Sequence, residues 1–271
     1  MIAEPLPYDM GNSGDLIKHG MIAEFAKWWL QHNRGPFIFY DPFGGRPWKE
    51  PPHEKVVERL LQLRDCALVA AQPDPNTRYY GSGHIIKNTA HNAGRSAKVF
   101  VSDRNQNAID DLVESGLERI ILENFTSENA YSILDSNLMS NNASLILLDP
   151  FADFLSSSDK LLPEITRVVA QAEVAVALFV LYDHSMSFEY EKFKDLQKIE
   201  FIEGTLQFSI SCPRLSNSEV KGEEKYCSDV ILFLPANYNT LQPVALRQSL
   251  KQYAGMLTLV LGQEITFEEL S

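Results

Sequence analysis

The sequence predicts an α/β fold: a seven-stranded, mostly parallel sheet with helices on both faces. Short, continuously apolar segments recur along the chain, as expected of strands that are buried on both sides. Amphipathic segments separate most of them, and this alternation is the pattern of a doubly wound sheet. The 271 residues, 45% of them hydrophobic and 22% charged, suffice to bury the core of such a sheet.

Seven segments are expected to form the strands: 36–41, 98–103, 119–123, 143–149, 174–183, 206–212 and 228–234. The first has the sequence PFIFYD, an apolar run that closes on an acid, and the next four repeat this design. The acids that close the first five strands are Asp41, Asp103, Glu123, Asp149 and Asp183.

Helices are expected between the strands, at 14–31, 54–71, 105–115, 127–138 and 159–172. The first places Ile17, Met21 and Phe25 on one face, with Ser13 as its N-cap. Within residues 46–78, prolines bracket a helical stretch, and we interpret this segment as a small helical insertion after the first strand. We therefore expect one domain over residues 1–271. The apolar stretch 244–261 is expected to pack on the sheet, with a monomer and a homodimer both left open.

The charge is unevenly distributed along the chain. The net charge is −12, but residues 1–100 contain 12 basic and 10 acidic residues, while residues 101–271 contain 12 and 26. A phosphate-rich partner is therefore tolerated by the first part and repelled by the second. No apolar run is long enough for a membrane span, and the N-terminus does not have the pattern of a secretory signal. Three scattered cysteines without metal-ligand spacing favour the cytoplasm and predict no metal site.

The acids that close the strands indicate where a ligand binds. In an open parallel sheet, ligands bind beyond the carboxyl ends of the strands, near the switch in strand order. The first strand runs into Asp41-Pro42-Phe43-Gly44-Gly45, whose glycines permit close approach of the backbone to a ligand. Neither the dinucleotide fingerprint nor a P-loop is present. Asp103 suits the ribose hydroxyls of an adenosine-bearing cofactor, either NAD or S-adenosylmethionine.

Two further segments concentrate polar residues. Residues 11–20, GNSGDLIKHG, place Asp15 and His19 one helical turn apart with Lys18 beside them. Such a face either lines a ligand pocket or is a solvated helix start. Residues 78–84, RYYGSGH, precede a helix with Ser82 as its expected cap, and N–H groups at a helix start bind carboxylate or phosphate.

The fourth strand ends in Asp149-Pro150-Phe151-Ala152. This resembles half of the motif of amino-methyltransferases, in which an acid and the carbonyl of the following proline accept the hydrogens of an exocyclic amine. Phe151 or Phe154 is the expected stacking face for the substrate. A simple Asp-Pro turn at the end of a strand is the alternative interpretation.

Taken together, GN-x-GD-x-x-KH, YD-x-x-GG, RYYGS and the later Asp-Pro occur in an order that resembles the bacterial 23S ribosomal RNA adenine-N6 methyltransferase family. The resemblance covers most of the chain. It implies a class I methyltransferase, Rossmann-like fold with a helical insertion after the first strand. It also implies S-adenosylmethionine as the cofactor.

The resemblance further implies roles for individual residues. Lys18 and His19 border the cofactor, Ser82 binds its methionine end and Asp103 its ribose. The expected cofactor-binding residues are Lys18, His19, Asp41, Phe43, Gly44, Ser82, Asp103, Asn124, Phe125 and Asp149. Asp149 is the catalytic acceptor, together with Pro150. The expected substrate-binding residues are Tyr8, Asn12, Phe151 and Phe154.

These features predict transfer of a methyl group to an exocyclic amine, with adenine N6 of RNA preferred and DNA as the second choice. The expected partner is therefore a nucleic acid, with a role in rRNA processing. Phe151 and Ala152 replace the second proline and the aromatic residue of the family motif, so a protein or small-molecule amine stays open as substrate. A catalytically silent binding protein is a further alternative. A nicotinamide oxidoreductase is disfavoured because the dinucleotide fingerprint is missing.

Overall fold

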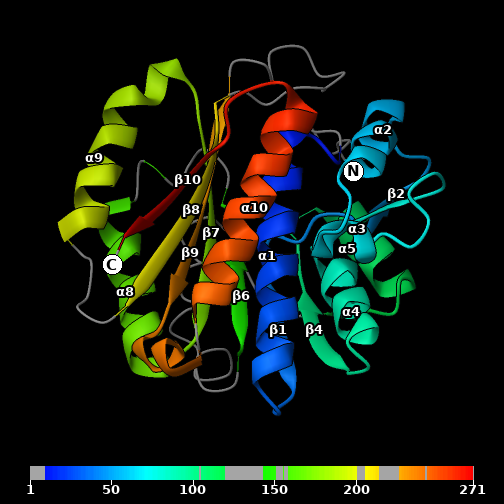
Figure 1. Ribbon diagram of the computed structural model, residues 1–271, viewed down its shortest axis with the longest axis horizontal. Helices are drawn as coiled ribbons and strands as arrows, with labels where there is room; N and C mark the ends of the chain where they lie inside the picture. The colour runs from blue at the N-terminus through cyan, green and yellow to red at the C-terminus, as the bar shows by residue number, and fades with distance from the viewer. Residues whose placement is uncertain are drawn as a thin grey trace.

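The computed structural model has a large mixed sheet at its centre, with helices covering both faces (Figure 1). It describes residues 10–103, 105–119, 143–150, 155, 158–199, 205–213, 226–241 and 243–270. The sheet has eight strands in the order β10-β8-β9-β7-β6-β1-β4-β5. The predicted mostly parallel α/β architecture is confirmed. The strand count of seven was wrong, because β10 adds an eighth strand at one edge.

The strands that form this sheet are β1 (Phe37–Asp41), β4 (Ala97–Val101), β5 (Glu118–Arg119), β6 (Leu145–Leu148), β7 (Ala175–Tyr182), β8 (Leu206–Cys212), β9 (Cys227–Leu234) and β10 (Thr266–Leu270). The pairs β5–β4, β4–β1, β1–β6 and β6–β7 are parallel. Strand β9 runs antiparallel between β7 and β8, and β10 pairs antiparallel with β8.

The helices that cover the sheet are α1 (Ser13–His32), α4 (Ser82–Asn92), α5 (Gln106–Glu114), α8 (Ser158–Ala172), α9 (Ser187–Ile199) and α10 (Pro243–Leu261). Successive residues of a strand point to opposite faces. In β1, Phe37 and Phe39 pack into the cluster that contains residues of α1, α4, α5 and α10, whereas Ile38 and Tyr40 face α8 and α9. Both faces are covered, which explains why the strands are continuously apolar.

Between β1 and α4 the chain forms β2 (Trp48–Lys49), α2 (Glu54–Gln62), α3 (Ala67–Ala70) and β3 (Tyr79–Tyr80), within the expected insertion. Strands β2 and β3 pair antiparallel as a separate two-stranded sheet. The single helix predicted for 54–71 was wrong. The chain breaks between α2 and α3, where Asp65 adopts a φ of 59°, a left-handed conformation that no helix interior accepts.

Helix α1 is buried nearly all round, because α3, α4, α10 and the sheet surround it (Figure 1). Its N-cap is Asn12 and not the expected Ser13. The C-terminal helix α10 lies beside α1 on the same face of the sheet. A Cβ atom on Gly20 would lie 2.0 Å from the ring of Tyr253, whose hydroxyl donates to Leu16 O at 2.7 Å. Glycine at position 20 thus permits this close contact between α1 and α10.

The remaining predicted elements are placed as follows. Of the strand expected at 119–123 the structure describes the first residue, and the helix expected at 127–138 lies outside the described residues. The short 3-10 helices η3 (His184–Met186) and η5 (Ala236–Leu241) follow β7 and β9. Within the described part of the chain, no helix combines the length and the apolar character needed to cross a membrane.

Candidate functional site

The strand order changes direction at β1 and β6, in the middle of the sheet. Strands β4 and β5 lie on one side of this pair, and β7 lies on the other. A reversal of this kind opens a crevice at the carboxyl ends of the two strands. Asp41 ends β1 and Asp149 directly follows β6, so both carboxylates border this position.

The first turn of α1 brings a third carboxylate to the same edge. Asn12 caps the helix, because its Oδ1 accepts from Asp15 N at 2.9 Å. Gly11 N in turn donates to Asp15 Oδ2 at 2.8 Å. Asn12, an expected substrate-binding residue, thus has its side-chain oxygen engaged in the cap. These bonds hold the buried Asp15 carboxylate beneath the start of the helix.

Lys18 joins the helix to the centre of the sheet. Its Nζ lies 2.6 Å from Asp149 Oδ2 and 3.1 Å from Asp15 Oδ1. The same ammonium lies 5.2 Å from the centroid of the Phe179 ring on β7. The side chains of Lys18, Asp15 and Asp149 are each at most 10% exposed, so this is a buried cation between two carboxylates.

The two acids respond differently to Lys18. At Asp15, burial alone would raise the pKa, but the Lys18 charge and the Gly11 N–H offset it and hold the pKa below its usual value. At Asp149, burial dominates over Lys18, so its pKa is raised. Asp15 is therefore the firmer counter-ion of Lys18.

One oxygen of Asp149 stands apart from this network. Asp149 Oδ1 is enclosed and has no hydrogen-bond partner among the described residues. A buried acceptor without a partner costs about 1–3 kcal/mol. The structure thus retains an enclosed, unsatisfied acceptor at the switch in strand order, next to the buried Pro150.

Asp41 is held by the start of α4 and by the turn after β1. Ser82 Oγ donates to Asp41 Oδ2, and Phe43 N donates to Asp41 Oδ1 at 3.0 Å. Burial raises the pKa of Asp41 to about 7, although the Ser82 and Lys18 contacts lower it. The N-cap of α4 is Gly81, so the expected capping role of Ser82 was wrong: its hydroxyl faces Asp41 instead.

The glycine turn brings β1 and β4 together at this edge. A Cβ on Gly44 would lie 2.0 Å from Val101 Cγ1, so a larger residue does not fit there without movement. Gly45 N donates to Asp103 Oδ2 at 3.0 Å, and Asn105 N donates to Asp103 Oδ1 at 2.6 Å. Two backbone donors thus orient the half-buried Asp103, whose charge also raises the pKa of Asp149.

His19 turns away from the carboxylates. Its Nδ1 lies 2.8 Å from the hydroxyl of Tyr79 on β3, and burial lowers the pKa of His19 to about 3. The ring is therefore neutral at physiological pH. The helical partner of Asp15 is Lys18, at i+3, while the hydrogen bond of His19 goes to Tyr79. The parts played by Tyr79 and Phe179 were missed, because each depends on contacts between distant segments.

The predicted residues therefore fall into three groups. The carboxyl edge brings together Asn12, Lys18, His19, Asp41, Gly44, Ser82, Asp103, Asp149 and Pro150. Phe43 belongs to the same turn, but its ring packs against the cluster on the α8 and α9 side. Five predicted residues lie outside the described residues: Tyr8, Asn124, Phe125, Phe151 and Phe154.

Of the other two acids that close predicted strands, Glu123 also lies outside the described residues. Asp183 caps η3 by accepting from Ser185 N at 2.8 Å, so its carboxylate is committed locally. In the described part of the chain, no group of three or more His, Cys, Asp or Glu side chains is placed to hold a metal ion.

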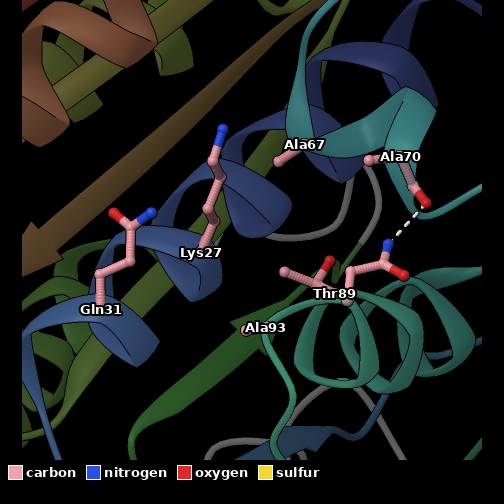
Figure 2. Close-up of a pocket in the computed structure, with 7 residues that line it drawn as sticks. Lys27, Gln31, Ala67, Ala70, Thr89 and Ala93 are labelled. Carbon is pink, nitrogen blue, oxygen red and sulfur yellow. Dashed lines mark hydrogen bonds between the residues drawn. The ribbon is translucent and has the colours of Figure 1, made fainter.

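A separate depression of about 170 Å³ lies on the outer surface, between α1, α3 and α4 (Figure 2). Lys27 and Gln31 flank it, and Thr89 and Asn92 come from α4. Its nearest lining residue on α1, Lys27, lies about 13 Å along the helix from Lys18, at a rise of 1.5 Å per residue. Thr89 Oγ1 and the Asn92 amide donate to backbone carbonyls, so these polar groups stabilise local structure. The depression is distinct from the crevice at the carboxyl edge.

Comparison with known proteins gives the fold. No family model matches the sequence, and no curated protein matches it. The chain is similar to a solved structure, protein LPL1258 from Legionella pneumophila str. Philadelphia 1, described under the family model DUF519. The TM-score is 0.62 over 97% of this chain and 98% of that one, at 13% sequence identity. At this identity the likeness shows a shared α/β fold alone.

Proposed function

We propose that this protein is a class I, S-adenosylmethionine-dependent methyltransferase that methylates an exocyclic amine, with adenine N6 of RNA as the preferred target. The observation that carries the proposal is the state of Asp149. One of its oxygens is held by Lys18 and the other is an unpaired, enclosed acceptor at the switch in strand order. An amine that is to be methylated needs such an acceptor.

The topology supports the finer fold assignment. A parallel sheet with one antiparallel strand inserted next to its last parallel strand is the arrangement of class I methyltransferases, and β9 occupies that place between β7 and β8. The resemblance in the sequence and the arrangement of the strands are independent arguments, because the first rests on motifs and the second on pairing.

The charges at the crevice favour a cationic cofactor. Asp41, Asp103 and Asp149 interact electrostatically there, and the described lysine among them, Lys18, is already paired with two acids. A dinucleotide would bring a pyrophosphate next to these carboxylates and be repelled. S-adenosylmethionine instead supplies a transferable methyl group on a positively charged sulfur.

The residues present fit this cofactor. Asp103 is oriented by Gly45 N and Asn105 N, and a carboxylate is the group that accepts hydrogen bonds from the two hydroxyls of a ribose. Gly44 lets the turn after β1 pack closely against Val101 on β4, next to Asp103. The N–H groups of the first turn of α4, which begins at Ser82, are suited to the carboxylate of the methionine part.

In catalysis, the chain positions the amine and leaves proton removal to solvent. Asp149 Oδ1 accepts one hydrogen of the target amine and the carbonyl of Pro150 accepts the other. These two hydrogen bonds direct the lone pair of the amine nitrogen toward the methyl group that is to be transferred. Lys18 fixes the Asp149 carboxylate in one orientation, which reduces the reorganisation needed at the moment of transfer. No general base is required, because the proton can leave after the new bond forms.

Two measurements test the proposal. Calorimetry is expected to detect S-adenosylmethionine binding to the wild type, and Asp103→Ala is expected to weaken it tenfold or more through loss of about 1.4 kcal/mol or more. Absence of cofactor binding to the folded wild-type protein would refute the function.

The substrate is tested by transfer of a radiolabelled methyl group to total RNA, with and without ribonuclease. Label that disappears after ribonuclease supports the RNA assignment. Label that survives ribonuclease on protein or small amines would instead support the second substrate class, which the excess of acidic residues in 101–271 favours.

A further inference from the structure

A compact group of aromatic rings and one guanidinium lies beside the proposed site. We call it the Trp48 cluster, and its members are Trp48, Arg78, Tyr80 and His84. Trp48 and Tyr80 are direct partners across β2 and β3. The Arg78 guanidinium lies 4.4 Å from the Trp48 ring centroid and 5.8 Å from that of Tyr80. His84 meets Trp48 edge-on at 5.3 Å and stacks with Tyr80 at 5.4 Å.

The same short segment carries both the cluster and contacts of the site. Tyr79, next to Tyr80, contacts His19 through its hydroxyl. Ser82, two residues beyond Tyr80, donates to Asp41. The insertion leaves from the carboxyl end of β1, so β2 and β3 lie at the edge of the sheet where the crevice opens (Figure 1).

The position of the cluster relative to the site is fixed by backbone contacts. Gly81 N donates to Pro47 O at 2.8 Å. A Cβ on Gly81 would lie 2.7 Å from Arg46 O, so only glycine permits this approach of the two strands. Because Gly81 connects β3 to Ser82, the cluster cannot move independently of Asp41.

The cluster is not a closed core. Trp48, Tyr80 and His84 are half-buried, and the Arg78 side chain is 30% exposed. Arg78 Nε donates to Glu50 Oε2 at 2.9 Å, which orients the guanidinium over the indole ring. The guanidinium is ion-paired with Glu50, and its side chain stays partly accessible to solvent.

Charge complementarity points to an anionic, π-faced partner. Residues 46–99 contain 9 Lys and Arg against 5 Asp and Glu, in a chain whose net charge is −12. Burial lowers the pKa of His84 to about 4, so its ring stays neutral and stacks without adding charge. An aromatic surface with a stacked guanidinium inside a locally basic segment is the composition that binds single strands through bases and phosphates.

We propose that the Trp48 cluster binds single-stranded nucleic acid, and that it holds a nucleotide flanking the one whose base enters the crevice. A base stacks on the exposed part of the cluster, and the Arg78 guanidinium contacts the neighbouring phosphate. The proposal rests on the proposed function and specifies its substrate as an unpaired strand and not a duplex, because the bases of a duplex stack on one another and present no face to the cluster.

The test uses the full chain and a fluorescein-labelled single-stranded RNA of about 12 nucleotides, with DNA of the same sequence in parallel, followed by anisotropy. Arg78→Gln and Trp48→Ala are expected to weaken binding about 5- to 100-fold, and Trp48→Phe to retain most of it. Arg34→Ala is the matched control. It removes one exposed cation at the opposite edge of the sheet, between α1 and β1.

Urea unfolding checks that each variant is folded, and calorimetric affinity for S-adenosylmethionine separates this proposal from the function. The Trp48 cluster is not a nucleic-acid site if the wild type binds neither oligonucleotide. The same conclusion follows if folded Arg78→Gln and Trp48→Phe both bind as the wild type does and Trp48→Ala weakens binding no more than Arg34→Ala does. Loss of cofactor binding in the wild type would refute the methyltransferase assignment, while the anisotropy result would still stand on its own.

Discussion

Two buried aspartates, Asp149 and Asp229, have similar surroundings but face opposite sides of the sheet, Asp149 toward α1 and Asp229 toward α9. Each faces one lysine, with Lys18 at 2.6 Å from Asp149 and Lys194 at 3.5 Å from Asp229. Each also has an enclosed Oδ1 without a hydrogen-bond partner among the described residues. Burial and an unpaired oxygen therefore do not by themselves distinguish a functional acid from a structural one.

Their neighbours do distinguish them. Asp229 lies on β9 and accepts a hydrogen bond from the Tyr190 hydroxyl of α9, while Tyr190 stacks on Tyr182 at 3.8 Å. These contacts anchor α9 to the sheet, and Lys194 is 21% exposed. Asp149 instead follows a central strand at the switch in strand order, where a ligand crevice is expected. Position in the topology, more than local chemistry, supports the role that we propose for Asp149.

The largest expected difference between the two acids is in methyl transfer. Asp149→Asn is expected to lower kcat by about 10³-fold or more, because the amide loses the charge that stabilises the amine as it becomes positive. Asp229→Asn is expected to leave kcat within about threefold, because it does not touch the crevice. Rates with saturating cofactor measure both, and equal losses in the two variants would remove the distinction.

The lysines sharpen the same comparison through stability. Lys18→Met leaves Asp15 and Asp149 buried without their cation, so the free energy of unfolding is expected to fall by about 3–5 kcal/mol. Lys194→Met is expected to cost about 1 kcal/mol or less, because solvent screens that pair. Urea unfolding of the two variants, matched in the residue that they introduce, provides the measurement. A loss for Lys18→Met no larger than that for Lys194→Met would show that solvent screens the ion pairs of both lysines.

Asp41 is expected to make the stability of the fold depend on pH. Its folded pKa of about 7 lies above the ordinary aspartate value of 3.8, so between these pH values the folded state retains a proton that the unfolded state has lost. Stability therefore falls as pH rises from about 4 to about 7, by on the order of 2–4 kcal/mol. Asp41→Asn is expected to flatten this fall in urea unfolding at pH 5, 6 and 7.5. An unchanged slope would show that another group titrates.

The smallest effect concerns the anchor on Asp229. Tyr190→Phe removes one hydroxyl and keeps the ring stacked on Tyr182, so unfolding is expected to become easier by about 1–2 kcal/mol. Methyl transfer is expected to stay near the wild-type rate. A large loss of activity would show that α9 contributes to the crevice and that the two acids belong to one functional unit.

Local pattern predicts part of this molecule well. Asp41, Asp103 and Asp149 were found because a buried strand is apolar until its exit, and the acid at the exit is visible in the sequence. β10 was missed because a short antiparallel edge strand has a weak pattern, and the break at Asp65 depends on one backbone angle.

Contacts between distant segments were beyond this kind of prediction. The ion pair of Lys18 with Asp149 joins residues 131 positions apart, and the hydrogen bond of His19 with Tyr79 joins residues 60 positions apart. The Trp48 cluster likewise depends on the pairing of β2 with β3. The local sequence of each segment does not indicate its distant partner, because the packing of the whole chain determines which segments contact one another.

The contact of Gly20 with Tyr253 has a consequence for how the protein is made. The helix that supplies Lys18 leaves the ribosome before Tyr253, whose hydroxyl bonds to a residue 237 positions earlier in the chain. Helix α1 therefore lacks this contact until α10 has also been synthesised. A premature stop upstream of α10 is expected to yield a product without a competent crevice, ready for degradation.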